Sequence, residues 1–117
     1  MQTSQLNTKK LFDEILLRAL DSALINALGE SAAKAVKFYV DTSVIIKDPQ
    51  VFEELLMKLF SGSNAGSRII EENIRDSLLR LLEERFSIKL LVGKDKDKGF
   101  RQFILDCRAK MNLELSE

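Results

Sequence analysis

The 117-residue sequence has no histidine, no tryptophan and one cysteine. Without histidine, catalysis by Ser-His-Asp or Cys-His groups is excluded, and so is the commonest metal ligand. A lone Cys107 allows no disulfide within the chain, and no zinc site of sulfur and imidazole ligands. We therefore expect no metal, no cofactor and no enzymatic activity.

Long apolar runs and an excess of one charge are also missing. No run approaches the roughly 18 apolar residues that span a bilayer, and Asp13, Glu14 and Arg18 interrupt the stretch that a secretory signal would need. We expect a cytoplasmic protein that does not enter a membrane. Lysines and arginines equal aspartates and glutamates at 18 each, so the chain lacks the basic surplus that favours nucleic acid.

The residues that are present predict one small all-α domain over 1–117. Hydrophobic residues make up 45% and charged ones 31%, with one proline, a mixture typical of a globular chain. Apolar positions recur at helical spacing over about two-thirds of the sequence. The predicted helices are 8–28, 31–41, 49–60, 67–86 and 100–112, with a frayed 1–6, a loop over 61–67 and a polar turn over 93–99.

Helix boundaries are marked by capping residues. Gly29 fits the end of the first helix, because glycine accepts left-handed geometry. Ser31 and Ser67 are predicted to cap the helices that follow them. Asp48-Pro49 is the strongest start signal, with the aspartate as cap and the proline at the first helical position.

Two stretches are predicted to depart from helix. Residues 42–46 are β-branched and residues 88–92 are apolar, so they could pair as a minor two-stranded element. In the second helix, we expect Ala32, Ala35, Val36 and Tyr39 to face the core. Aromatic residues at helical spacing are usually core, but Tyr39 with its neighbour Phe38 could instead line a ligand pocket.

The same elements allow a winged-helix interpretation. The loop 93–99 would be the wing and helix 67–86 the recognition helix, with nucleic-acid contacts from Lys94, Lys96, Lys98 and Arg101. The recognition helix argues against this, because it carries five acidic residues beside four arginines. Acidic groups that face phosphates weaken binding.

Residues 24–82 show a series of motifs. They are Leu24-Ile-Asn-Ala-Leu-Gly29-Glu-Ser31, Lys34-Ala-Val-Lys-Phe-Tyr39 and Asp48-Pro-Gln-Val-Phe52, before a closing helix. This order resembles a small archaeal domain family of the Nitrosopumilus output domain type. The resemblance implies a helical signalling-output module without catalytic residues. The positions that carry the family pattern are structural: Gly29, Ser31, Tyr39, Asp48, Pro49 and Phe52.

The preferred prediction is a non-enzymatic helical interaction module that associates with itself, as a homodimer, or with another protein. The first helix and residues 67–91 carry more large apolar side chains than one stripe needs, and such an excess is often buried against a partner. The alternatives are a winged-helix DNA-binding regulator and a small-ligand sensor with a pocket near Tyr39.

Overall fold

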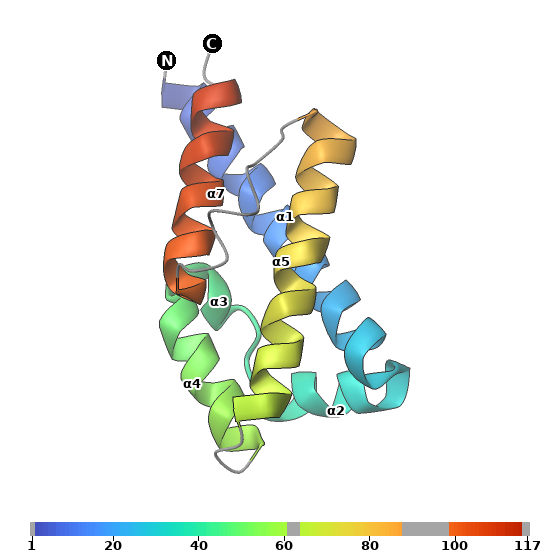
Figure 1. Ribbon diagram of the computed structural model, residues 1–117. Coiled ribbons are helices and arrows are strands. Elements are labelled where there is room, and N and C mark those ends of the chain that lie inside the picture. The colour runs from blue at the N-terminus through green and yellow to red at the C-terminus, as the bar shows by residue number, and fades with distance from the viewer. Residues whose placement is uncertain (1, 61–63, 88–98, 116–117) are drawn as a thin grey trace.

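A computed structural model describes residues 2–60, 64–87 and 99–115 of the chain, and these form six helices (Figure 1). The all-α class is confirmed. None of the described residues lies in a β-strand. The helices are α1 (Gln2–Leu28), α2 (Glu30–Tyr39), α3 (Val44–Lys47), α4 (Pro49–Leu59), α5 (Asn64–Phe86) and α7 (Phe100–Leu115).

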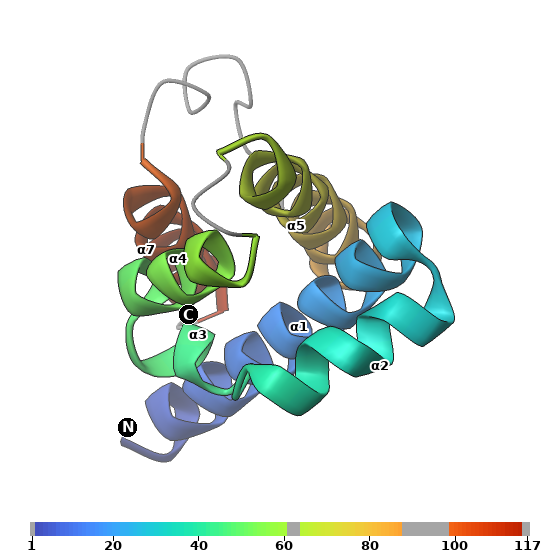
Figure 2. The same ribbon diagram turned by 90° about the horizontal axis from the view of Figure 1, so that it is seen from below.

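Helix α1 is the centre of the molecule. Helices α5 and α7 pack against it, and α2 turns back from its C-terminal end and contacts it on a different side (Figures 1 and 2). Its buried residues therefore form a wide band, as the breadth of its apolar pattern predicted: Phe12, Ile15, Leu16, Ala19, Leu20, Ala23 and Leu24. The apolar excess of α1 is thus covered largely within the chain.

A tight turn at Gly29 joins α1 to α2. Its φ of 87° lies in the region that favours glycine, as predicted. Its N–H donates to the Ile25 carbonyl at 2.8 Å, and its own carbonyl accepts from the Ala33 N–H at 2.9 Å. Gly29, not Ser31, is therefore the N-cap of α2. The predicted Ser31 cap is wrong, because the turn closes two residues earlier and Ser31 falls inside the helix.

The predicted strand over 42–46 is also wrong, because these residues form a turn followed by α3. The Asp41 side chain accepts hydrogen bonds from the Ser43 N–H at 3.1 Å and the Ser43 hydroxyl at 2.6 Å. This local turn places the next N–H groups against the carbonyls three residues back, so local bonding overrides β propensity. The predicted partner strand, 88–92, lies outside the described residues.

Helix α4 begins as the sequence predicts. Asp48 is its N-cap and accepts a hydrogen bond from the Gln50 N–H at 3.0 Å, and Pro49 is in the first turn. Phe52 and Leu56 are fully buried. The local signal was sufficient here, because both cap residues act within one helical turn.

Two predicted helix starts are too late. Helix α1 begins at Gln2 and α5 at Asn64, because polar residues extend an existing helix at small cost. Ser67 is therefore a buried residue inside α5 rather than its cap. Gly66 lies close to Phe60, because a Cβ at position 66 would be 3.0 Å from the Phe60 ring, which would then have to shift by a few tenths of an ångström. The predicted end of α5 and start of α7 are confirmed, whereas 93–98 lie outside the described residues.

None of the helices in the described part of the chain combines the length and the apolar character that crossing a bilayer requires.

Candidate docking surface

Helix α2 carries two apolar faces, and only one of them is covered. Ala33 and Val36, followed by Val40, are buried at the spacing i, i+3, i+7 that defines one helix face. This face packs against α1. An ion pair between Lys37 Nζ and Asp21 Oδ1, at 2.9 Å, connects the same two helices. The rotation of α2 about its axis is therefore fixed by contacts with α1.

The second face points to solvent. Ala32, Ala35 and Tyr39 are exposed, so their predicted place in the core is wrong, while the prediction for Val36 is confirmed. Both sets of residues have helical spacing, and the position of α1 decides which one is buried. The exposed set remains because α2 lies at the edge of the helix assembly (Figure 2).

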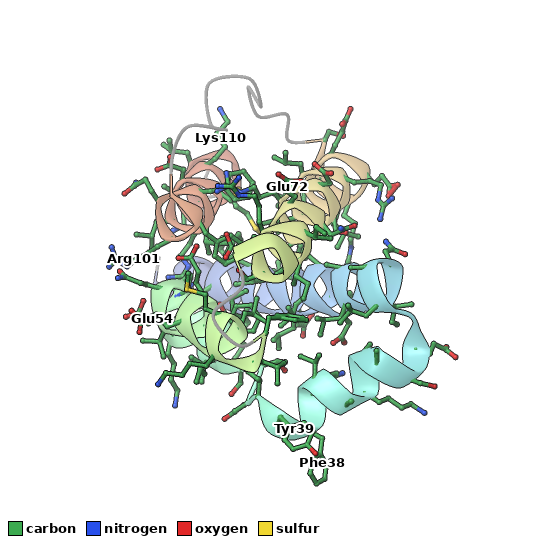
Figure 3. All side chains as sticks on the ribbon, turned by 60° about the horizontal axis from the view of Figure 1, so that its bottom comes forward. Phe38, Tyr39, Glu54, Glu72, Arg101 and Lys110 are labelled. Carbon is green, nitrogen blue, oxygen red and sulfur yellow. The ribbon has the colours of Figure 1, made fainter. Side chains whose placement is uncertain are left out.

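Two aromatic rings dominate this exposed face. Phe38 is 83% exposed and Tyr39 74%, the highest values among the described large hydrophobic residues. Their ring centroids are 5.3 Å apart and their planes meet at 80°, an edge-to-face arrangement that aromatic pairs prefer. Both side chains point away from the body of the molecule (Figure 3). They face solvent rather than line a pocket, so the predicted pocket at these rings is not formed.

We define the docking surface as Ser31, Ala32, Ala35, Phe38 and Tyr39, all exposed. At 100° per residue, the rows 31–35–38 and 32–35–39 both pass through Ala35, which is therefore at the centre of the face. The charged residues of α2 lie along a different side of the helix: Glu30, Lys34 and Lys37. The docking surface itself carries no charged side chain.

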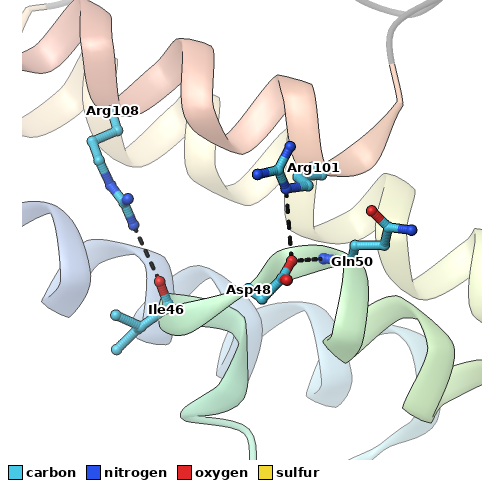
Figure 4. A network of polar contacts seen from close by, with 5 residues as sticks. All are labelled: Ile46, Asp48, Gln50, Arg101 and Arg108. Atoms are coloured by element: carbon cyan, nitrogen blue, oxygen red, sulfur yellow. Dashed lines mark hydrogen bonds and ion pairs between the residues drawn. The ribbon is translucent and has the colours of Figure 1, made fainter.

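The basic residue predicted to contact nucleic acid from α7 is already engaged. Arg101 Nε lies 3.7 Å from Asp48 Oδ1, the same oxygen that caps α4 (Figure 4). The guanidinium thus faces an acidic group within its own chain, which offsets its attraction for a phosphate. The other predicted contacts, Lys94, Lys96 and Lys98, lie outside the described residues.

A second arginine of α7 connects three helices. Arg108 Nη2 donates to the Ile46 carbonyl at 3.4 Å and lies 3.9 Å from Asp13 Oδ1 (Figure 4 shows the first contact). Its guanidinium also lies 5.4 Å from the centre of the Phe12 ring, within range of a cation–π interaction. Arg108 therefore holds α7 to α1 and to the end of α3, and its role is structural.

A carboxyl pair between α4 and α5 was not predicted. Burial, together with a hydrogen bond to Glu53 and the charge of Glu53, raises the pKa of Glu71 to about 8, although Arg75 and Arg68 oppose this. At neutral pH a protonated Glu71 can therefore donate to the Glu53 carboxylate. The two residues are 18 positions apart, so no helical spacing points to their contact.

The carboxyl pair does not make a metal site. Within the part of the chain that the structure describes, no group of three or more Asp, Glu or Cys residues could hold a metal ion. The family-pattern residues do not converge on a reactive site either. Gly29, Asp48, Pro49 and Phe52 shape turns, caps and core, whereas Ser31 and Tyr39 belong to the docking surface.

Comparison of the chain with protein-family models, with curated proteins and with solved structures found no match.

Proposed function

We propose that this chain is a non-enzymatic interaction module that binds a protein partner through the docking surface of α2. The observation that carries the proposal is the exposed Phe38–Tyr39 pair on a helix whose other face is anchored to α1. Isolated exposed apolar residues are normal on protein surfaces, but a contiguous patch on one helix face is typical of a recognition site.

The energetics favour docking at this surface. Full burial of an aromatic side chain of this size is worth about 1.5–3 kcal/mol. Aromatic residues are enriched among those that dominate binding energy. The contact with α1 already orders the helix, so a partner would restrict mainly the two aromatic side chains.

The exposed apolar face lies on α2 rather than on α1, whose apolar excess predicted association. The apolar residues of α1 are largely covered by other helices of the same chain, so they do not call for a partner. The uncovered apolar face belongs to α2, where the sequence pattern predicted a core face. We keep the role in signalling output as part of the proposal, supported by the motif order over 24–82 alone.

Photo-crosslinking tests this function without assuming the identity of the partner. Benzoylphenylalanine would replace Phe38 in one variant and Ile69 in another, with the chain expressed in cells and irradiated. Ile69 is the matched control, because it is 52% exposed but lies on α5. We expect covalent protein adducts of defined mass from position 38 and none from position 69. No adduct at 38, or the same adducts at both positions, would contradict the proposal.

A further inference from the structure

The side chains of the docking surface increase in size from the N-terminal to the C-terminal half of α2. Its residues in the N-terminal half are small, Ser31 and Ala32, and its residues in the C-terminal half are the two aromatic side chains. Ala35 lies between them. We infer that the partner is a second copy of this chain, docked by an antiparallel contact between the two α2 helices with Ala35 at the two-fold axis. This inference rests on the proposed function and names its partner.

Antiparallel pairing makes the surface complementary to itself. A two-fold axis at Ala35 brings the C-terminal half of the surface on one copy to the N-terminal half on the other, and each of the rows 31–35–38 and 32–35–39 then meets the same row of the second copy. Phe38 then lies opposite the partner's Ser31, and Tyr39 lies opposite the partner's Ala32. Each large ring meets a small residue, which is how packed helix pairs fill space. An isologous contact of this kind closes after two copies.

The alternative parallel pairing lacks this fit. It would place the two rings of one copy against the two rings of the partner, and the small residues against the small residues. The aromatic ends would then hold the helices apart, and a gap would remain at the small-residue ends. Antiparallel pairing instead allows close approach at Ala35, where both helices carry only a methyl group.

The charges of α2 permit the contact. Glu30, Lys34 and Lys37 lie along a side of the helix away from the centre of the docking surface, and Lys37 is paired with Asp21. No charge is therefore buried without a partner, which would oppose association. A ten-residue helix is about 15 Å long, so the interface is at the small end of specific ones. We expect a dimer whose dissociation constant is on the order of micromolar.

Disulfide trapping tests the position of the axis. In Ala35→Cys the two introduced thiols would face each other across the axis, within the roughly 4.4–6.8 Å between Cα atoms that a disulfide needs. Ser31→Cys is the matched control, because it lies on the same surface about 6 Å from the axis along the helix, about 12 Å from its own copy. Cys107 is buried, and the unsubstituted chain measures its background. We expect oxidation to yield covalent dimers of Ala35→Cys only.

A size swap tests the opposition of large and small residues. Light scattering over a concentration series should show a dimer for the unsubstituted chain and dissociation for Ala32→Phe and for Tyr39→Ala. The double variant carrying both changes should dimerise again, because each ring meets the partner's alanine. All three variants change only exposed positions, and circular dichroism checks their fold.

The results that would overturn this inference differ from those that would overturn the proposed function. A chain that stays monomeric up to millimolar concentration, while position 38 cross-links to a different protein or to none, overturns the second copy as partner. A dimer in which Ser31→Cys cross-links as well as Ala35→Cys, or in which the double variant stays dissociated, overturns the antiparallel geometry. The proposed function fails only if position 38 gives no specific protein adduct.

Discussion

Helices α1 and α2 pack against each other, but they differ in how much of their apolar surface is buried. α1 has neighbours on several sides and buries a wide band of its surface, with Leu20 and Phe12 fully enclosed. α2 lies at the edge, where α1 covers one face and the aromatic pair projects from another (Figure 3). The number of neighbours, rather than apolar content, therefore separates a helix that builds the core from one that presents a surface.

The largest effect is expected where α1 is enclosed. Leu20→Ala leaves a cavity in the fully buried band, and we expect it to lower the free energy of unfolding by about 2–5 kcal/mol. Ile25→Ala, on the same helix but 45% exposed, should cost less than about 1 kcal/mol. Urea unfolding followed by circular dichroism measures both. Equal losses at the two positions would mean that α1 is not enclosed on its predicted core side.

A smaller effect on stability, one that depends on pH, is expected at the pair of Glu53 and Glu71 between α4 and α5. The pKa of Glu71 is raised from 4.5 to about 8 in the folded chain. A carboxyl group with a raised folded-state pKa stabilises the fold fully below its unfolded pKa and loses that contribution as the pH rises through about 8. Glu71→Gln keeps a neutral donor beside Glu53 at every pH.

We therefore expect Glu71→Gln to gain stability relative to the unsubstituted chain between pH 4.5 and 8. The gain at pH 8 should be on the order of 1–2 kcal/mol, because water at the half-buried site weakens the penalty of the charge. Urea unfolding at a series of pH values measures the difference. Glu72→Gln removes one negative charge at an exposed neighbouring position and controls for net charge. An identical pH profile for both variants would contradict the shared proton.

Two substitutions compare a helix start that has a side-chain cap, in α4, with one that has none, in α2. Asp48→Ala removes the cap of α4 and the acidic partner of Arg101, and we expect it to cost about 1 kcal/mol. Ser31→Ala, in the first turn of α2, should cost a few tenths of a kcal/mol at most, since α2 has no side-chain cap. Thermal unfolding measures the loss of stability in both variants. A greater loss in Ser31→Ala than in Asp48→Ala would show that Ser31 caps α2 after all.

The smallest effect on stability is expected at the docking surface itself. Phe38→Ser combined with Tyr39→Ser should change the free energy of unfolding of the dilute monomer by about 0.5 kcal/mol or less, because both rings are exposed. Urea unfolding at low protein concentration measures this change. A loss of about 2 kcal/mol or more would show that the rings support the fold, and the comparison between α1 and α2 would fail.

Local signals predicted the parts of the fold that depend on one helical turn. Asp48-Pro49 identified the start of α4, and Gly29 identified the end of α1. Residues 42–46 show the limit of propensity, because the Asp41–Ser43 hydrogen bonds turn a β-branched stretch into α3. Propensity alone does not include such side-chain bonds to the backbone.

The candidate surface needed the tertiary structure. In α2 the rows 32–35–39 and 33–36–40 both have apolar helical spacing, and only the position of α1 selects the buried row. The Glu53–Glu71 pair was likewise invisible, because its members come from different helices. Periodicity predicts that a helix has faces, but the neighbours decide which face is covered.

The quenching of Tyr39 fluorescence tests the central claim most directly. The chain has one tyrosine and no tryptophan, so its ultraviolet emission reports on the docking surface. We expect acrylamide to quench Tyr39 in dilute solution nearly as well as a free tyrosine derivative. The quenching should fall as the protein concentration rises through the dissociation constant. Quenching that stays weak at every dilution, or that does not change with concentration, would contradict an exposed face that a second copy covers.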